Sequence, residues 1–123
     1  MQTFKKTERL CSKNLIDKLF ETGKSFNSFP FKVIWIEAAE RISPVSVVIS
    51  VPKRSFKKAV DRNKIKRRIR EGYRKNKKLL YTNLTDKKIL LMLIYTSKNM
   101  VEYNELEKKI ILMVQRLSLE TNN

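Results

Sequence analysis

The feature that most constrains this chain is a dense run of positive charge in its middle. Residues 53–78 hold fourteen Lys and Arg against Asp61 and Glu71 only, a net charge of +12. The whole chain of 123 residues carries +16, so most of the excess lies in this one segment. Unpaired charges are strongly destabilised away from water. The segment must therefore lie on a surface, anchored by the few apolar residues within it.

Those apolar residues have helical spacing. Val60, Ile65, Ile69, Tyr73 and Leu80 form one stripe, which predicts a helix over residues 57–80 with a single face in the core. A merely solvated helix mixes Glu with Lys on its outer face, and this one does not. We therefore expect a polyanionic partner, and nucleic acid fits better than a membrane surface because the helix has no apolar ridge beyond the one its core requires.

The rest of the sequence predicts one small domain, residues 1–123, of the α+β class. We expect further helices over residues 13–22 and 101–119, and strands over 29–37, 45–51 and 88–95, with a short extra strand near 24–26 as an alternative. The predicted order is α-β-β-β-α-β-α in a two-layer sandwich.

The connections between these elements are predicted as well. Residues 40–44 are expected to close a hairpin, residues 82–86 to interrupt the chain, and residues 118–123 to fray. A helix joins the strands at 45–51 and 88–95, so these strands are expected to be parallel. Such crossovers are normally right-handed.

The composition argues against several kinds of catalytic and metal-binding site in this chain. The chain has no His, the commonest general base and metal ligand. The single Cys11 cannot form an internal disulfide or a thiolate zinc site. Asp61 and Glu71, ten residues apart on one helix, lie about 15 Å apart and cannot share a metal ion. We therefore expect no catalytic residue and no metal site in the polypeptide.

The sequence also favours a cytoplasmic protein. No apolar segment follows the charged first residues, as a signal peptide would require. The longest apolar run, Ile89–Tyr95, is too short to cross a membrane.

The centre of the basic run resembles a known family. Residues 59–71 read Ala-Val-Asp-Arg-Asn-Lys-Ile-Lys-Arg-Arg-Ile-Arg-Glu. This run closely resembles the signature of the bacterial ribonuclease P protein subunit, with Lys64 in place of an Arg. Ser50–Arg54 is similar to the family's Ser-Val-x-Lys-Lys strand end, and Phe4–Leu10 with Phe20 and Gly23 is similar to its opening helix. The resemblance covers residues 4 to about 117.

The resemblance implies a fold and a role. The fold is ribosomal protein S5 domain 2-like, with a left-handed βαβ crossover. The partner is a catalytic RNA that uses Mg²⁺ to remove the 5′ leader of precursor tRNA. The enzyme is then an endoribonuclease formed by RNA and protein, with its catalytic centre in the RNA and no cofactor held by the protein. The implied RNA-binding residues are Arg62, Asn63, Lys64, Lys66, Arg67, Arg70, Lys53 and Arg54.

A cleft for the leader is expected beside the first predicted helix. Alternation along residues 29–37 divides that strand into two faces. The face expected in the core carries Phe31, Val33 and Trp35. The wetter face carries Lys32, Ile34 and Ile36. The residues expected to line the cleft are Phe20, Ile16, Lys32 and Ile34. The alternatives are that Phe20 and Ile34 are ordinary core residues and that Trp35 is the stacking platform.

Rival functions remain open on the sequence alone. A generic RNA-binding or ribosomal protein without a role in tRNA processing would carry the same basic helix. A nuclease that needs no RNA subunit is a second rival. Under the main interpretation the protein is monomeric and forms a 1:1 complex with the catalytic RNA, and neither DNA nor a membrane is a partner.

Overall fold

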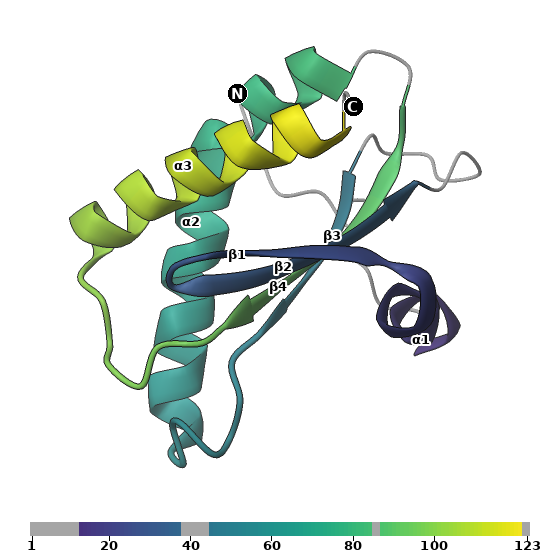
Figure 1. Ribbon diagram of the computed structural model, residues 1–123. Coiled ribbons are helices and arrows are strands. Elements are labelled where there is room, and N and C mark those ends of the chain that lie inside the picture. The colour runs from purple at the N-terminus through teal and green to yellow at the C-terminus, as the bar shows by residue number, and fades with distance from the viewer. Residues whose placement is uncertain (1–12, 38–44, 85–86, 122–123) are drawn as a thin grey trace.

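The computed structural model describes residues 13–37, 45–84 and 87–121. Its elements, in chain order, are α1 (Lys13–Thr22), β1 (Lys24–Ser28), β2 (Phe31–Glu37), β3 (Val45–Ser50), α2 (Ala59–Leu84), β4 (Ile89–Tyr95) and α3 (Tyr103–Thr121). The predicted α-β-β-β-α-β-α order is confirmed, including the short strand that was only an alternative. Helices α2 and α3 cover one face of the sheet and α1 covers the other (Figure 1).

The four strands form one mixed sheet in the order β1-β2-β4-β3. Strands β1 and β2 make an antiparallel hairpin, and β2 also pairs antiparallel with β4. The predicted hairpin between residues 29–37 and 45–51 is therefore wrong, because β4 lies between these two strands. Strand β4 is the most apolar of the four and is buried along nearly its whole length, which suits a central position. The predicted turn at 40–44 lies outside the described residues.

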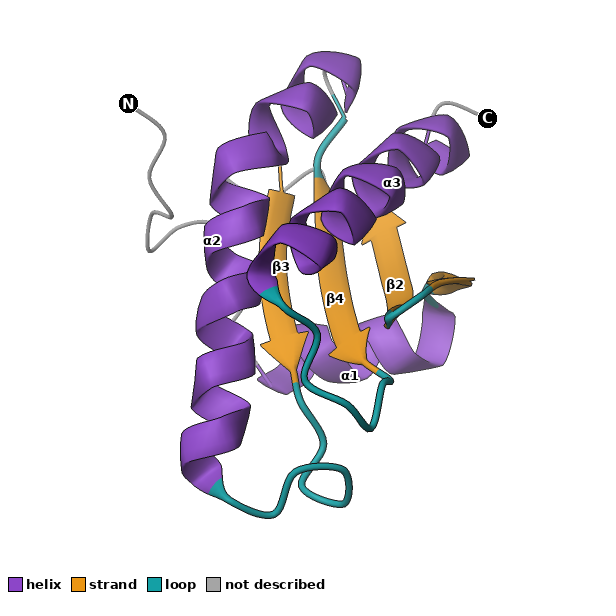
Figure 2. Cartoon of the chain, turned by 90° about the vertical axis from the view of Figure 1, so that its left-hand side faces the viewer, coloured by secondary structure: helices purple, strands orange, loops and turns teal. Residues whose placement is uncertain are grey.

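Strands β3 and β4 are parallel, as predicted, with Val45 opposite Ile89. Figure 2 shows both arrows pointing down, β4 to the right of β3, and the helices α2 and α3 on the viewer's side of the sheet. When the strands are turned to point upward, β4 lies to the left of β3 with α2 in front. The crossover is therefore left-handed, as the family resemblance implied and against the general rule.

The larger core lies between the sheet and the helices α2 and α3. Phe31, Val33 and Trp35 belong to it, which confirms the face of β2 that was expected in the core. From α2 the fully buried members are Ile65, Ile69, Tyr73, Leu80 and Leu84. Val60, the first residue of the predicted stripe, is 75% exposed and does not belong to it.

A smaller core lies on the opposite face, beneath α1. Leu19 of α1 packs there with Ile34, Leu90 and Met92 of the sheet. Gly23 ends the helix so close to β2 that a Cβ atom would lie 2.4 Å from the Leu19 carbonyl oxygen and 2.7 Å from Ile34 Cγ2. The absence of a side chain at Gly23 thus lets α1 lie against the sheet.

Two helices extend further than predicted. Helix α2 continues to Leu84 because this residue prolongs the buried stripe one turn beyond Leu80, so the predicted break at 82–86 is wrong for residues 82–84. Helix α3 continues to Thr121, whose side chain is buried and whose carbonyl oxygen accepts a hydrogen bond of 2.5 Å from Lys87 Nζ. The predicted fraying is therefore wrong for residues 118–121.

Candidate nucleic-acid interface

The core stripe of α2 fixes which residues point to solvent. Asn63, Lys64, Arg67 and Arg70 are exposed and Lys66 is half-buried. We call these five residues the outer face of α2. Within the part of the chain that the structure describes, the four cations of this face have no ion pair or side-chain hydrogen bond. No side chain in the described ranges neutralises their charge, which is therefore available to a polyanion.

Arg62 has different surroundings from the rest of its motif. Its Nη1 atom donates hydrogen bonds of 2.8 and 2.9 Å to the carbonyl oxygens of Phe56 and Lys57. These bonds fasten the loop before α2 to the first turn of the helix. The family resemblance implied one RNA-binding role for Arg62, Lys66 and Arg70. The structure adds a positioning role, and its contact with RNA stays a prediction.

The loop between β3 and α2 holds the remaining predicted RNA contacts. Lys53 and Arg54 are exposed on a turn in which the amide of Phe56 donates to the carbonyl oxygen of Pro52 (3.3 Å). The Phe56 ring is buried and packs against Tyr95 with 6.0 Å between ring centroids. Phe56 anchors this loop, which leads from β3 into the amino-terminal end of α2 (Figure 2), and the two cations lie on it.

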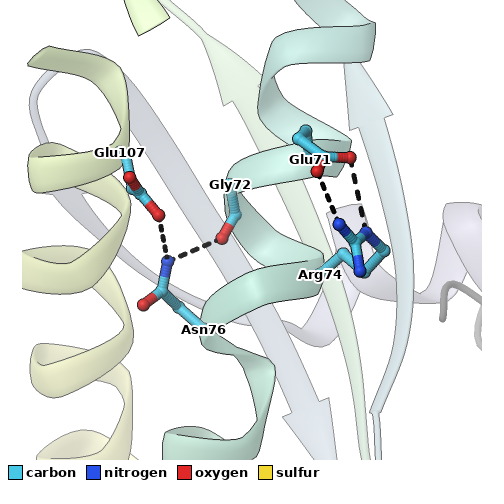
Figure 3. Close-up of polar contacts among 5 residues, drawn as sticks. All are labelled: Glu71, Gly72, Arg74, Asn76 and Glu107. Carbon is cyan, nitrogen blue, oxygen red and sulfur yellow. Dashed lines mark hydrogen bonds and ion pairs between the residues drawn. The ribbon is translucent and has the colours of Figure 1, made fainter. Parts of the chain in front are cut away.

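Further along α2 the positive charge is partly neutralised. Arg74 forms a two-point ion pair with Glu71, with nitrogen–oxygen distances of 2.5 and 3.3 Å (Figure 3). The hydrogen bonds from Arg74 lower the pKa of Glu71, and the same contact raises the pKa of Arg74. Lys77 is only 7% exposed and lies over the ring of Tyr81. The segment of +12 net charge therefore presents its free cations mainly in the first half of the helix.

The four predicted cleft residues are not equally accessible. Phe20 is 59% exposed, so the alternative that it belongs to the core is wrong, and Lys32 is also exposed. Ile16 is half-buried against the smaller core. Ile34 is 6% exposed and packs in the smaller core beneath α1, so it offers little surface to a leader, and its place in the cleft stays a prediction.

The alternative stacking platform is also excluded by burial. Trp35 is 3% exposed, and Lys24 Nζ lies 5.2 Å from the centroid of its ring. A base cannot stack on a ring that is closed on the core side and covered by an ammonium group on the other. Phe20 is therefore the exposed aromatic side chain among the predicted cleft residues.

The junction of α2 and α3 was not predicted as a functional region. Arg68 Nη1 donates to the carbonyl oxygen of Val101 (2.9 Å), and Asn76 donates to Gly72 O and Glu107 Oε2 (2.8 and 3.3 Å) (Figure 3). The Arg68–Val101 and Asn76–Glu107 contacts join residues 33 and 31 positions apart, so sequence spacing on one helix could not reveal them. Beside them lies a pocket of about 330 Å³, lined by Arg67, Arg68, Glu71 and Tyr103.

Among residues 13–37, 45–84 and 87–121, no three His, Cys, Asp or Glu side chains come together as metal ligands would. No described helix has the length and apolar character to cross a membrane.

Comparisons with known proteins agree with one another. The family model described as Ribonuclease P matches residues 4–118. The chain is 40% identical over 85 residues to a ribonuclease P protein component of Porphyromonas gingivalis, covering 68% of this chain and 62% of that protein. It is 33% identical over 118 residues to the one of Petrotoga mobilis, covering 94% and 96%. The fold is similar to the solved ribonuclease P protein of Thermotoga maritima, with a TM-score of 0.71 and 25% identity over 89% of this chain and 96% of that one.

Proposed function

The chain belongs to the ribonuclease P protein family, and we propose that it is the protein subunit of a ribonuclease P ribonucleoprotein. In this role it binds a catalytic RNA and precursor tRNA, and assists removal of the 5′ leader. The chain spans only about 62% of the length of the P. gingivalis relatives. Its activity, substrate and partner are therefore part of what we propose. We also propose that the protein is monomeric, that it forms a 1:1 complex with the catalytic RNA, and that it acts in the bacterial cytoplasm.

The observation that carries the proposal is the outer face of α2. Its cations lack partners among the described residues, yet the buried stripe on the other side of the helix holds them in a fixed array. Arg67 and Arg70 present planar forks that can bind phosphate oxygens in pairs, and Lys64 and Lys66 act as point charges. Asn63 can exchange hydrogen bonds with a ribose 2′-hydroxyl, which DNA lacks. Such a face fits the backbone of a folded RNA.

The leader of precursor tRNA is proposed to pass on the other side of the sheet. Phe20 offers an exposed ring on which an unpaired base can stack, and Lys32 offers a charge for the adjoining phosphate. Helix α1 carries the first residue and strand β2 the second, and these elements pack together around Leu19 and Ile34. The protein would then hold RNA partner and substrate on two surfaces of one rigid sheet.

Chemistry is assigned to the RNA in this proposal. Mg²⁺ ions bound by the RNA would activate the attacking water, whereas the protein would screen phosphate repulsion and position the leader. The contribution of the protein is therefore expected to be largest when Mg²⁺ is scarce, because the cations of α2 then replace part of the ionic screening.

Reconstitution tests the proposal directly. Precursor tRNA is incubated with protein alone, with catalytic RNA from the same organism alone, and with both, at low and at high Mg²⁺. We expect correct cleavage at low Mg²⁺ only in the complete mixture, and no cleavage by protein alone. Binding without stimulation would favour the generic RNA-binding rival, and cleavage by RNA-free protein would favour the protein-only nuclease.

A further inference from the structure

The pocket at the junction of α2 and α3 shares only Arg67 with the proposed phosphate contacts. Arg67, Arg68 and Glu71 line it from α2, and Tyr103 lines it at the first residue of α3. Its volume of about 330 Å³ falls at the lower end of small-ligand sites and is enough for one nucleobase. Arg67 belongs to both this pocket and the outer face of α2, so the two surfaces are continuous.

Two of the four lining side chains are held in place by hydrogen bonds, and a lysine lies over the ring of a third. Arg68 donates to the carbonyl oxygen of Val101, and Glu71 is fixed by the two-point contact with Arg74. Lys75 Nζ lies 5.3 Å from the centroid of the Tyr103 ring. Fixed walls lower the ordering cost that a ligand must overcome.

The chemistry of the lining argues against a simple phosphate site. Most of the wall is apolar, formed by an aromatic ring and the stems of long side chains. Glu71 stays ionised because Arg74 lowers the pKa of its carboxyl, and a carboxylate repels a phosphate. A flat, uncharged ring with polar edges fits these walls better.

One polar atom at the pocket residues also lacks a partner. The hydroxyl oxygen of Tyr103 is buried and has no hydrogen-bond partner among the described residues. Buried polar groups without partners are uncommon in folded proteins. A ligand edge that enters beside the ring would supply such a partner after a small shift of the side chain.

We propose that this pocket holds one unpaired base of the RNA partner, and that guanine is the base it accepts best. The N1–H and N2–H groups of guanine can donate to the Glu71 carboxylate, while O6 and N7 accept from a guanidinium group of Arg67 or Arg68. Uracil offers no amino group to the carboxylate. The inference rests on the proposed function, because the RNA partner is the source of the base.

The first experiment uses free nucleotides and needs no catalytic RNA. Isotope-labelled protein is titrated with GMP, UMP and inorganic phosphate, and chemical shifts are followed by NMR. We expect GMP to move the signals of Arg67, Arg68 and Tyr103 at lower concentration than UMP does, and phosphate to leave Tyr103 unmoved. Glu71→Gln should reduce the preference for GMP. Equal responses to GMP and phosphate would overturn the proposal.

The second experiment uses variants in the complex with catalytic RNA. Tyr103→Ala removes the aromatic wall of the pocket and should weaken RNA binding about fivefold or more, without changing the salt dependence, because no phosphate contact is lost. Tyr103→Phe keeps the ring but loses the hydroxyl, and should bind RNA more tightly than Tyr103→Ala and less tightly than the wild type. Leu112→Ala, at a 53% exposed position on α3, is the matched control and should bind as the wild type does.

The two proposals fail in different ways. Wild-type affinity in Tyr103→Ala, together with normal stimulation of cleavage, would refute the base pocket and leave the proposed function intact. Failure of the wild-type protein to bind or stimulate the RNA would refute the proposed function, while the nucleotide titration would still decide whether the pocket accepts guanine.

Discussion

Two arginines five residues apart in one motif have different surroundings. Arg62 is committed to the carbonyl oxygens of Phe56 and Lys57, whereas Arg67 is exposed beside the pocket. The sequence predicted one role for both, since residue type and spacing do not reveal which backbone oxygens lie nearby. At this scale, most of the residues predicted to bind RNA are exposed or half-buried, and Ile34 is the exception because it is buried.

Substitution of these two arginines should separate the roles. Arg67→Ala should lower RNA affinity and leave the melting temperature unchanged. It should reduce the slope of log affinity against log salt concentration by about 0.7 to 0.9, the value for one lost phosphate contact. Arg62→Ala should lower the melting temperature as well, because two loop hydrogen bonds are lost. Salt titrations and thermal melts of both variants check this. Identical slopes in Arg67→Ala and wild type would remove Arg67 from the interface.

The Glu71–Arg74 pair predicts a defined pH dependence. The pKa of Glu71 is lowered from its ordinary 4.5 in the folded protein, so the pair stabilises the fold above the unfolded pKa. That contribution is lost as the pH falls through the lower, folded value. NMR titration of the Glu71 carboxyl carbon should give a midpoint below 4.5, and Arg74→Ala should raise it. A midpoint that Arg74→Ala leaves unmoved would contradict the assigned cause.

At the scale of elements, local sequence patterns predicted the helices and strands but did not predict which strands pair. Helical periodicity predicted α1, α2 and α3 because each helix buries one stripe, and β-branched or apolar runs predicted β2, β3 and β4. Which strands lie side by side depends instead on which strand would lose most free energy if its apolar side chains were exposed to water. Strand β4 takes the central place for that reason and separates β2 from β3, so the predicted hairpin failed.

The position of α1 against β2 should depend on Gly23. Gly23→Ala would bring a Cβ atom against the Leu19 carbonyl oxygen and Ile34, so we expect the free energy of unfolding to fall by about 1 to 3 kcal/mol. Chemical denaturation measures this. Glu21→Ala, at an exposed site on the same helix, is the control and should change stability by about 0.5 kcal/mol or less. Equal stability of the two variants would show that α1 can move away from the sheet at no cost.

At the scale of the whole molecule, the sheet separates two surfaces. Helix α2 covers one face of the sheet and α1 covers the opposite face (Figures 1 and 2). The exposed cations belong to α2 and the exposed Phe20 to α1. The net charge and the motif predicted an RNA partner, but the arrangement of two surfaces required the left-handed crossover, which sequence periodicity cannot supply. The pocket beside Tyr103 also appears only at this scale, because α2 and α3 create it together.

The central claim is that the outer face of α2 docks the catalytic RNA. The most direct test compares two double variants, each of which removes two positive charges, in RNA-binding titrations over a range of salt concentrations. Arg67→Gln with Arg70→Gln should weaken binding and reduce the salt slope by about 1.5, as two lost phosphate contacts require. Lys108→Gln with Lys109→Gln, on α3, should leave the slope close to that of the wild type. An equal loss of slope in both double variants would contradict the claim, because the RNA would then respond to net charge and not to this face.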